Sequence, residues 1–150
     1  MHEGLRIRAA TAADVPDIAD LLRQLGYPAP AEAIPGRLAR MLAEPGQTVL
    51  VASEGERVVG LATVIVRHVI HDDAPFARLA ALVVAEDRRG RGVGRALAAA
   101  AEEIAVAAGC SLMEVTSGDH RPGAHDFYRE LGYEERPRRF LKRLEPGSDR

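Results

Sequence analysis

The residues with the clearest chemical potential are the glycines and arginines between positions 88 and 95. This segment reads Arg88-Arg89-Gly90-Arg91-Gly92-Val93-Gly94-Arg95 and follows the apolar run Leu82-Val83-Val84. Glycine lets the backbone adopt positive φ and approach a ligand closely. The first N–H groups of a helix have no partner within the helix and lie at the positive end of its dipole. A strand, a glycine turn and a helix in this order therefore predict a site for a phosphate or pyrophosphate, with the arginines adding charge.

Two other phosphate-binding loops fit this segment less well. A P-loop requires a lysine after its last glycine, and none follows here. A dinucleotide fingerprint requires a third glycine or alanine where this chain has Leu97. The remaining structural alternative is a glycine turn that carries solvent-exposed arginines. Three closely spaced glycines weaken a helix start unless a ligand must approach the backbone, and this favours the binding interpretation.

The elements that must position this loop follow from hydrophobic periodicity. Gly26 and Gly109 mark two helix ends, and the first helix begins with either a Thr11–Asp14 capping box or Asp14 as its cap before Pro16. The order is β-α-α-β-β-β-α-β-α-β. Strands are expected near 5–8, 48–53, 57–67, 78–84, 111–116 and 138–144, and helices near 15–25, 35–44, 93–108 and 124–131. This pattern predicts one mixed α/β (α+β) domain over residues 1–150, with a core from about 5 to 144 and a loose C-terminal tail.

Composition excludes several classes of protein. The 150 residues are 47% hydrophobic and 28% charged, and the net charge of −2 gives no general reason to bind nucleic acid. The apolar runs are too short to span a bilayer, and the N-terminus lacks the apolar core of a signal peptide. A single cysteine, Cys110, excludes an internal disulfide and supplies no zinc-ligand spacing. We therefore expect a cytoplasmic enzyme or binding module without nucleic-acid or membrane partners.

Two motifs resemble those of the GCN5-related N-acetyltransferase (GNAT) superfamily. Arg89-x-x-Gly92-x-Gly94 is similar to its [QR]-x-x-G-x-[GA] motif, and the segment from Ala124 to Tyr133 is similar to its A-x-x-F-Y-x-x-x-G-[FY] segment. The resemblance extends over nearly the whole chain and implies the GNAT fold. That fold is a twisted, mostly antiparallel sheet, splayed at the acetyl-CoA site and flanked by about four helices. Residues 114–128 are also loosely similar to aminoalkylphosphonate N-acetyltransferase-like bacterial members.

The resemblance implies which residues bind the cofactor. Backbone amides from Arg89, Gly90, Arg91, Gly92, Val93, Gly94 and Arg95 would hold the pyrophosphate of acetyl-CoA. Leu82, Val83 and Val84 would pair with the pantetheine arm as with an added strand, and a backbone N–H near Val84 would stabilise the oxyanion. Tyr128 would donate the proton to the departing thiolate as a general acid. No metal is expected.

The general base is the least determined part of the site. Many relatives carry a glutamate just before the Leu-Val-Val run, where this chain has Ala80-Ala81. Weak candidates for the base are Glu114 and His71, with Asp72, His120 and His125 as further alternatives, and a water relay without a dedicated base is an equal alternative. The loop around His68, His71, Asp72 and Asp73 matches no zinc pattern.

The resemblance implies an acetyl-CoA-dependent N-acetyltransferase that acts directly on a primary amine of a small molecule or peptide. The acceptor would be bound by segments 25–30, 68–76 and 133–140. Arg121, Arg138 and Arg139 could meet an anionic acceptor. A non-catalytic acetyl-CoA-binding or sensing module is the alternative, because the usual glutamate is absent. An RNA-binding domain is opposed by the acidic net charge. The acceptor and the formation of a homodimer are left open.

Overall fold

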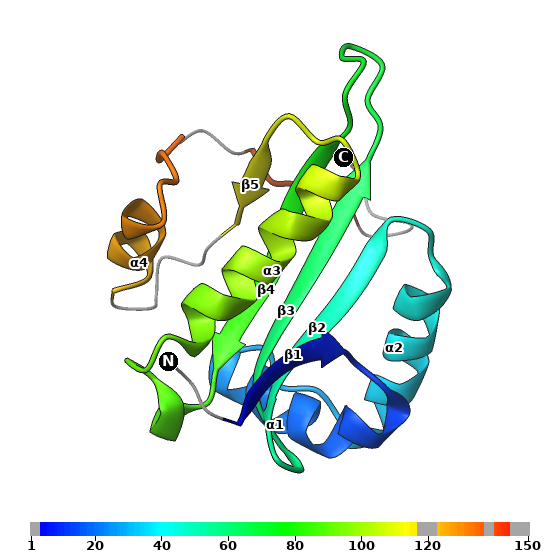
Figure 1. Ribbon diagram of the computed structural model, residues 1–150. Helices are drawn as coiled ribbons and strands as arrows, with labels where there is room; N and C mark the ends of the chain where they lie inside the picture. Colours follow the sequence, from blue (N-terminus) through cyan, green and yellow to red (C-terminus); the bar gives the residue numbers. More distant parts are fainter. Residues whose placement is uncertain (1–3, 117–122, 137–139, 145–150) are drawn as a thin grey trace. The chain divides into compact units, whose positions relative to one another are not determined.

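The computed structural model describes residues 4–116, 123–136 and 140–144 (Figure 1). The chain divides into two compact units, Met1–Ser117 and Gly118–Arg150. The first unit contains β1 (Leu5–Ala9), α1 (Val15–Leu25), α2 (Ile34–Ala43), β2 (Gln47–Glu54), β3 (Arg57–Arg67), β4 (Phe76–Val84), α3 (Val93–Ala107) and β5 (Met113–Val115), with short 3-10 turns between some of them. The second unit contains α4 (Ala124–Glu130).

The five strands form one sheet in the order β1-β2-β3-β4-β5. The pairs β1–β2, β2–β3 and β3–β4 are antiparallel, whereas β4 and β5 are parallel and are joined through α3. β3 and β4 are rich in β-branched and small apolar residues, and half of their residues are buried. The sheet core therefore lies in β2, β3 and β4, where Val51, Val59, Val64 and Val83 are almost completely buried.

A β-bulge divides β4 into two parts. Thr63 pairs with Ala81 and Val64 with Leu79, so Ala80 is an extra residue on β4. The ladder with β5 ends at the same place, because its last pair is Leu79 with Val115. Within the described ranges, β4 therefore continues beyond Leu79 with β3 on one side and no β5 pairing on the other. This separation is the splay expected for the fold.

The start of α3 lies very close to β3. Gly60 has no side chain, and a Cβ atom there would lie 2.8 Å from Leu97 Cδ1 and 3.1 Å from Val93 Cγ1. Val93 and Leu97 are both buried on the face of α3 that meets the sheet. Glycine at position 60 thus lets the first turns of α3 approach the strand more closely than an alanine would.

A partly buried ion pair connects β1 to the turn before α1. The Arg8 guanidinium donates two hydrogen bonds of 2.8 Å to the Asp14 carboxylate, which also accepts the Thr11 N–H at 2.8 Å. Asp14 is 5% exposed. A 3-10 turn over Ala12–Asp14 leads into α1, so Asp14 both closes the capping box and anchors the edge strand.

Most expected elements are present, and the mixed α/β class and mostly antiparallel sheet are confirmed. Most boundaries agree to within one residue, but β4 begins earlier, at Phe76, and β5 is shorter than expected, covering only Met113–Val115. No helix in the described part of the chain has the length and apolarity needed to cross a membrane.

The strand expected near 138–144 is wrong for the residues that can be described. Residues 140–144 carry no strand, whereas 138 and 139 and the tail from 145 lie outside the described residues. The physical reason is the pattern Phe140-Leu141-Lys142-Arg143-Leu144. Neighbouring Phe140 and Leu141 would point to opposite faces of a strand, so the segment lacks the strict alternation of a half-buried strand.

The Arg8–Asp14 pair gives the first testable prediction. Hydrogen bonding from Arg8, the largest cause, lowers the pKa of Asp14 from its ordinary value. Its contribution to stability is therefore complete above about pH 4 and disappears as the pH falls through the lowered pKa. Asp14→Asn should cost about 1–3 kcal/mol at pH 7 and much less at pH 2. Urea denaturation at both pH values tests this, and an equal cost at both would contradict it.

The close approach at Gly60 gives a second prediction. Gly60→Ala should lower the free energy of unfolding by about 1–3 kcal/mol, because the added methyl group overpacks the α3–β3 contact. Gly36→Ala is the matched control, since Gly36 lies in α2 and an added Cβ would meet only Arg40 Nη1 at 3.7 Å. That change should stabilise the protein by about 0.5–1 kcal/mol. Urea denaturation should give opposite signs, and two stabilising results would contradict the tight contact.

Candidate functional site

The glycine loop joins the end of β4 to α3. A 3-10 turn over Glu86–Arg88 follows the strand, and Gly90 and Gly92 then take positive φ values of 78° and 85°. α3 begins at Val93, and the Ala96 N–H donates to the Gly92 carbonyl at 3.0 Å. The amides of Val93, Gly94 and Arg95 precede this helical bond and lie at the N-terminal end of the dipole. The segment thus has the local geometry of an anion cradle.

The four arginines of the loop have different roles. Arg88 Nε donates to Glu54 Oε1 at 2.7 Å, and its Nη1 lies 3.2 Å from Asp87 Oδ2. Arg89 Nε donates to the Val84 carbonyl at 3.0 Å, which ties the loop back to the strand. Arg91 and Arg95 are exposed. The expectation that all four side chains add charge to the anion site is therefore corrected for Arg88, whose charge is already balanced by carboxylates.

The edge of β4 beyond the bulge carries backbone groups that point away from β3. The Ala85 N–H donates to the Val59 carbonyl at 2.8 Å, so Ala85 faces β3. Because successive residues of a strand direct their backbone groups to alternate sides, those of Leu82 and Val84 face the other edge. Among the residues that can be described, β5 does not pair with β4 there. This edge runs directly into the glycine loop.

The two candidates for a general base lie in different surroundings. Glu114 is next to Arg78 in the β4–β5 register, and its Oε1 accepts the Arg78 Nε–H at 2.6 Å. His71 is exposed in the 68–75 connection between β3 and β4 (Figure 1). That connection is at the opposite end of β4 from Val84 and the glycine loop. Glu114 is therefore paired with Arg78 near the start of β4, and His71 precedes β4, whereas the glycine loop follows the strand's other end.

The other histidines and the acidic groups can be examined for a metal site only where the structure describes them. His125 is exposed on α4, and His120 lies outside the described residues, as do Arg121, Arg138 and Arg139. No group of three or more His, Cys, Asp or Glu side chains within the described ranges is arranged to hold a metal ion.

Tyr128 belongs to an aromatic cluster in the second unit. Its ring meets Phe127 edge-on at 5.2 Å and Tyr133 at 6.0 Å between ring centroids. The Tyr133 N–H donates to the Tyr128 carbonyl at 3.0 Å, and Tyr128 is half-buried. The helix and the turn after it thus fix the orientation of this ring within its own unit.

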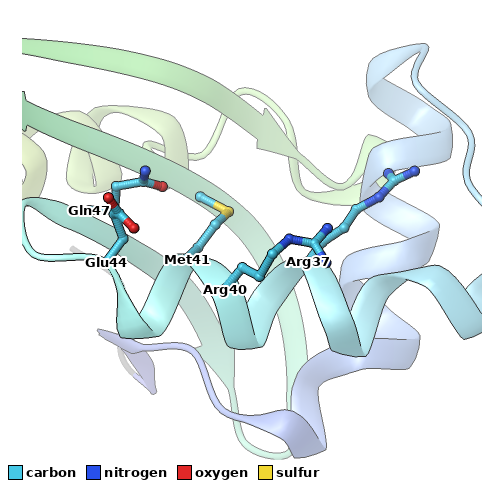
Figure 2. A pocket seen from close by; sticks show the side chains of 5 residues that line it. All are labelled: Arg37, Arg40, Met41, Glu44 and Gln47. Atoms are coloured by element: carbon cyan, nitrogen blue, oxygen red, sulfur yellow. The ribbon is translucent and has the colours of Figure 1, made fainter.

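An open hollow of about 370 Å³ lies between α2 and the start of β2 (Figure 2). It is lined by Arg37, Arg40, Met41, Glu44 and Gln47. Gln47 pairs with Ile65 near the end of β3, whereas the glycine loop is at the Gly60 end. The hollow is therefore separate from the glycine loop.

Sequence reasoning missed the side chains that hold the loop from outside. These are Gln24, Glu54, Arg57 and Asp87, together with Gly60 beneath α3. Each of the four side chains contacts a residue 30 to 62 positions away along the chain. An antiparallel pairing of residues 57–67 with 78–84, had it been inferred, would have indicated that residues 54–57 lie near the loop.

Comparison with known proteins places this geometry in a family. The model of the acetyltransferase (GNAT) family matches residues 15–133. The aminoalkylphosphonate N-acetyltransferase of Salmonella typhimurium strain LT2 is 32% identical over 143 residues, which cover 92% of this chain and 90% of that protein.

Solved structures have the same fold. A GNAT family acetyltransferase from Staphylococcus aureus subsp. aureus USA300_TCH1516 has a TM-score of 0.80 at 22% identity, covering 94% of this chain and 99% of that one. The aminoglycoside N-acetyltransferase AAC(6')-Iy in complex with CoA has a TM-score of 0.81 at 22% identity, covering 93% and 94%. With the family match and the Salmonella relative, these likenesses show that the chain belongs to the GNAT family and is an acyltransferase.

Proposed function

We propose that the protein is an N-acetyltransferase that uses acetyl-CoA and acts directly on a primary amine of a small molecule or peptide. The observation that carries the proposal is that β4, whose described pairing with β5 ends at Leu79, continues through Val84 directly into the glycine loop. One extended ligand with an amide-containing arm and a diphosphate would match both parts. Coenzyme A has this chemistry, and a related acetyltransferase, AAC(6')-Iy, has been solved in complex with it.

In this proposal the donor is bound mainly by the main chain. The diphosphate accepts hydrogen bonds from amides of residues 89–95, and Arg91 and Arg95 supply positive charge. The pantetheine arm lies along Leu82–Val84 as an added strand. The backbone N–H groups on that edge, such as that of Val84, are then available to stabilise the oxyanion that forms on the thioester carbonyl.

The transfer is proposed to occur in one ternary complex. The neutral amine attacks the carbonyl carbon, the C–S bond breaks, and the coenzyme A thiolate takes a proton from Tyr128. The amine loses its proton to water, because Glu114 is engaged by Arg78 and His71 is at the far end of β4. An acyl-cysteine step is disfavoured. Burial raises the pKa of the Cys110 thiol, which follows the end of α3 about 22 Å from the helix start.

The acceptor is proposed to be an amine recognised by residues around the acetyl site, and two sets of relatives suggest different chemistry. The Salmonella relative is named for aminoalkylphosphonates and AAC(6')-Iy for aminoglycosides. Thiol release from acetyl-CoA, measured with aminoalkylphosphonates, aminoglycosides and peptides, would identify the class. Binding of coenzyme A without turnover of any amine would favour the non-catalytic sensing module, which the Ala80-Ala81 sequence makes the second candidate.

The glycine loop generates a prediction on cofactor binding. Gly92→Asp places a carboxylate where the diphosphate is proposed to lie, so affinity for coenzyme A should fall by about 10²-fold or more. Gly109→Asp is a matched control, because Gly109 also has positive φ but lies beyond the other end of α3. Both changes should cost about 1–2 kcal/mol of stability. Calorimetry with coenzyme A should separate them, and equal affinities would contradict the loop assignment.

Tyr128 generates a prediction on turnover. Tyr128→Phe keeps the ring and removes the proton donor, so kcat should fall by about 10²-fold while coenzyme A affinity and the fold persist. Tyr133→Phe makes the same chemical change in the same aromatic cluster; because residue 133 begins an expected acceptor segment, any effect should fall on KM for the amine, and kcat should stay within about twofold. Steady-state kinetics with the best amine from the panel tests both variants. Full turnover by Tyr128→Phe would remove this residue from the mechanism and leave solvent as the proton source.

A further inference from the structure

Four charged residues connect the β2–β3 turn to the turn that precedes the glycine loop. Arg57 donates two parallel hydrogen bonds of 2.8 Å to Asp87, and Arg88 donates one of 2.7 Å to Glu54. Arg88 also lies 3.2 Å from Asp87. We call Glu54, Arg57, Asp87 and Arg88 the hairpin clamp. The hairpin clamp connects the β2–β3 turn to the segment that follows β4. Both lie at the end of the sheet where β2 ends and β3 begins (Figure 1).

α1 holds the same two segments from a third side. Gln24 Oε1 accepts the Glu86 N–H at 2.9 Å, and Asp20 in turn accepts the Gln24 side-chain amide at 2.7 Å. Asp17 accepts the Val58 N–H at 3.0 Å, next to Arg57. The 3-10 turn Glu86–Arg88 is thus attached by side chains to both the helix and the hairpin, although it is largely exposed.

Between this turn and α3, the Arg89 bond to the Val84 carbonyl is followed by a glycine-rich stretch. Gly90 and Gly92 give the backbone wide conformational freedom, and an added Cβ at Gly90 would meet nothing within 4 Å. A cradle of amides binds an anion well only if the amides are already oriented, because ordering them on binding reduces affinity. The end of the loop that adjoins β4 is therefore where anchoring has the greatest effect.

We propose that the hairpin clamp preorganises the glycine loop and thereby sets the affinity for coenzyme A, an inference that rests on the proposed function. Its members are positioning residues, because they act through the backbone of residues 86–89 and not by touching the ligand. Arg88 and Arg57 are held by carboxylates, so their charges are not the ones offered to the diphosphate. Arg91 and Arg95 remain for that role.

The clamp stays charged over the working pH range. Hydrogen bonding from Arg57, the largest cause, lowers the pKa of Asp87 to about 2. A carboxylate with this pKa is ionised at any pH where an amine acceptor could be tested. The clamp is thus a permanent structural tie and not a pH switch.

Removal of a clamp carboxylate tests this idea by the sign of its effect. Coenzyme A is an anion, so loss of a nearby negative charge should strengthen its binding if only long-range electrostatics matter. If the hairpin clamp preorganises the loop, loss of the carboxylate should instead weaken coenzyme A binding. Asp87→Ala removes the partner of Arg57 and should weaken coenzyme A binding by about three- to fivefold, the range expected for a well-formed exposed ion pair.

Glu86→Ala is the matched control. Glu86 is in the same turn and carries the same charge, and its side chain makes none of the clamp contacts. Its backbone N–H bond to Gln24 survives the change. Calorimetry with coenzyme A should show unchanged or tighter binding for Glu86→Ala and weaker binding for Asp87→Ala. With an amine acceptor, KM for acetyl-CoA should rise in Asp87→Ala while kcat stays within about twofold.

Arg57→Met gives an independent route to the same contact. In a double-mutant cycle, the Asp87→Ala and Arg57→Met double variant should bind coenzyme A no more weakly than the weaker single variant. If Asp87→Ala does not fold, Arg57→Met alone should still weaken binding about threefold. Arg40→Met, an exposed arginine on α2, is the control for loss of positive charge.

The outcomes separate this inference from the proposed function. If the wild-type protein does not bind coenzyme A, the proposed function fails and the clamp inference fails with it. If the wild-type protein binds but Asp87→Ala matches Glu86→Ala, only the clamp inference is overturned. Additive effects of Asp87→Ala and Arg57→Met on coenzyme A affinity would overturn it as well.

Discussion

The contact between α3 and β3 at Gly60 is the constraint on which the rest of the site depends. The first turn of α3 carries the amides of the glycine loop, and its distance from the sheet is set by the missing side chain at Gly60. β3 also pairs with the part of β4 that ends at Val84. β3 therefore determines where the glycine loop begins and where α3 starts. It also positions the last residues of β4, Leu82–Val84, relative to the loop and the helix.

Charge in this region is divided between holding the backbone and meeting a ligand. Arg57 and Arg88 are paired with Asp87 and Glu54, whereas Arg89 donates to the Val84 carbonyl and keeps its positive charge. A count of arginines therefore overstates the positive potential at the loop. The division is consistent with a chain of net charge −2 that still presents a local anion site. Exposed ion pairs contribute little to global stability, so their value here lies in fixing local geometry.

Several parts of this structure could be predicted because the determining signals are local. Gly26 ends α1 in a left-handed conformation, and the glycines at 90 and 92 have the positive φ that their spacing suggested. The GNAT resemblance added the mostly antiparallel pairing of the sheet. The failures have two kinds of cause. The Arg88 ion pair depends on Glu54, 34 residues away, whereas the strand expected near residue 140 failed because the segment lacks strict alternation. Tyr128 and Val84 belong to different compact units, so the role of Tyr128 as proton donor to the thiolate stays a proposal.

The way in which β5 joins the sheet has a consequence for how the protein is made. β1 to β4 pair as an antiparallel set of strands, whereas β5 pairs with β4 over only three residues and must wait for the whole of α3. Contacts between distant segments form slowly because the intervening chain must first be closed. During synthesis, the first 84 residues can therefore assemble four strands before α3 and β5 have left the ribosome. Until then α3 has not formed after the glycine loop. The newly made chain then has the sheet but lacks the helix N-terminus at which coenzyme A is proposed to bind.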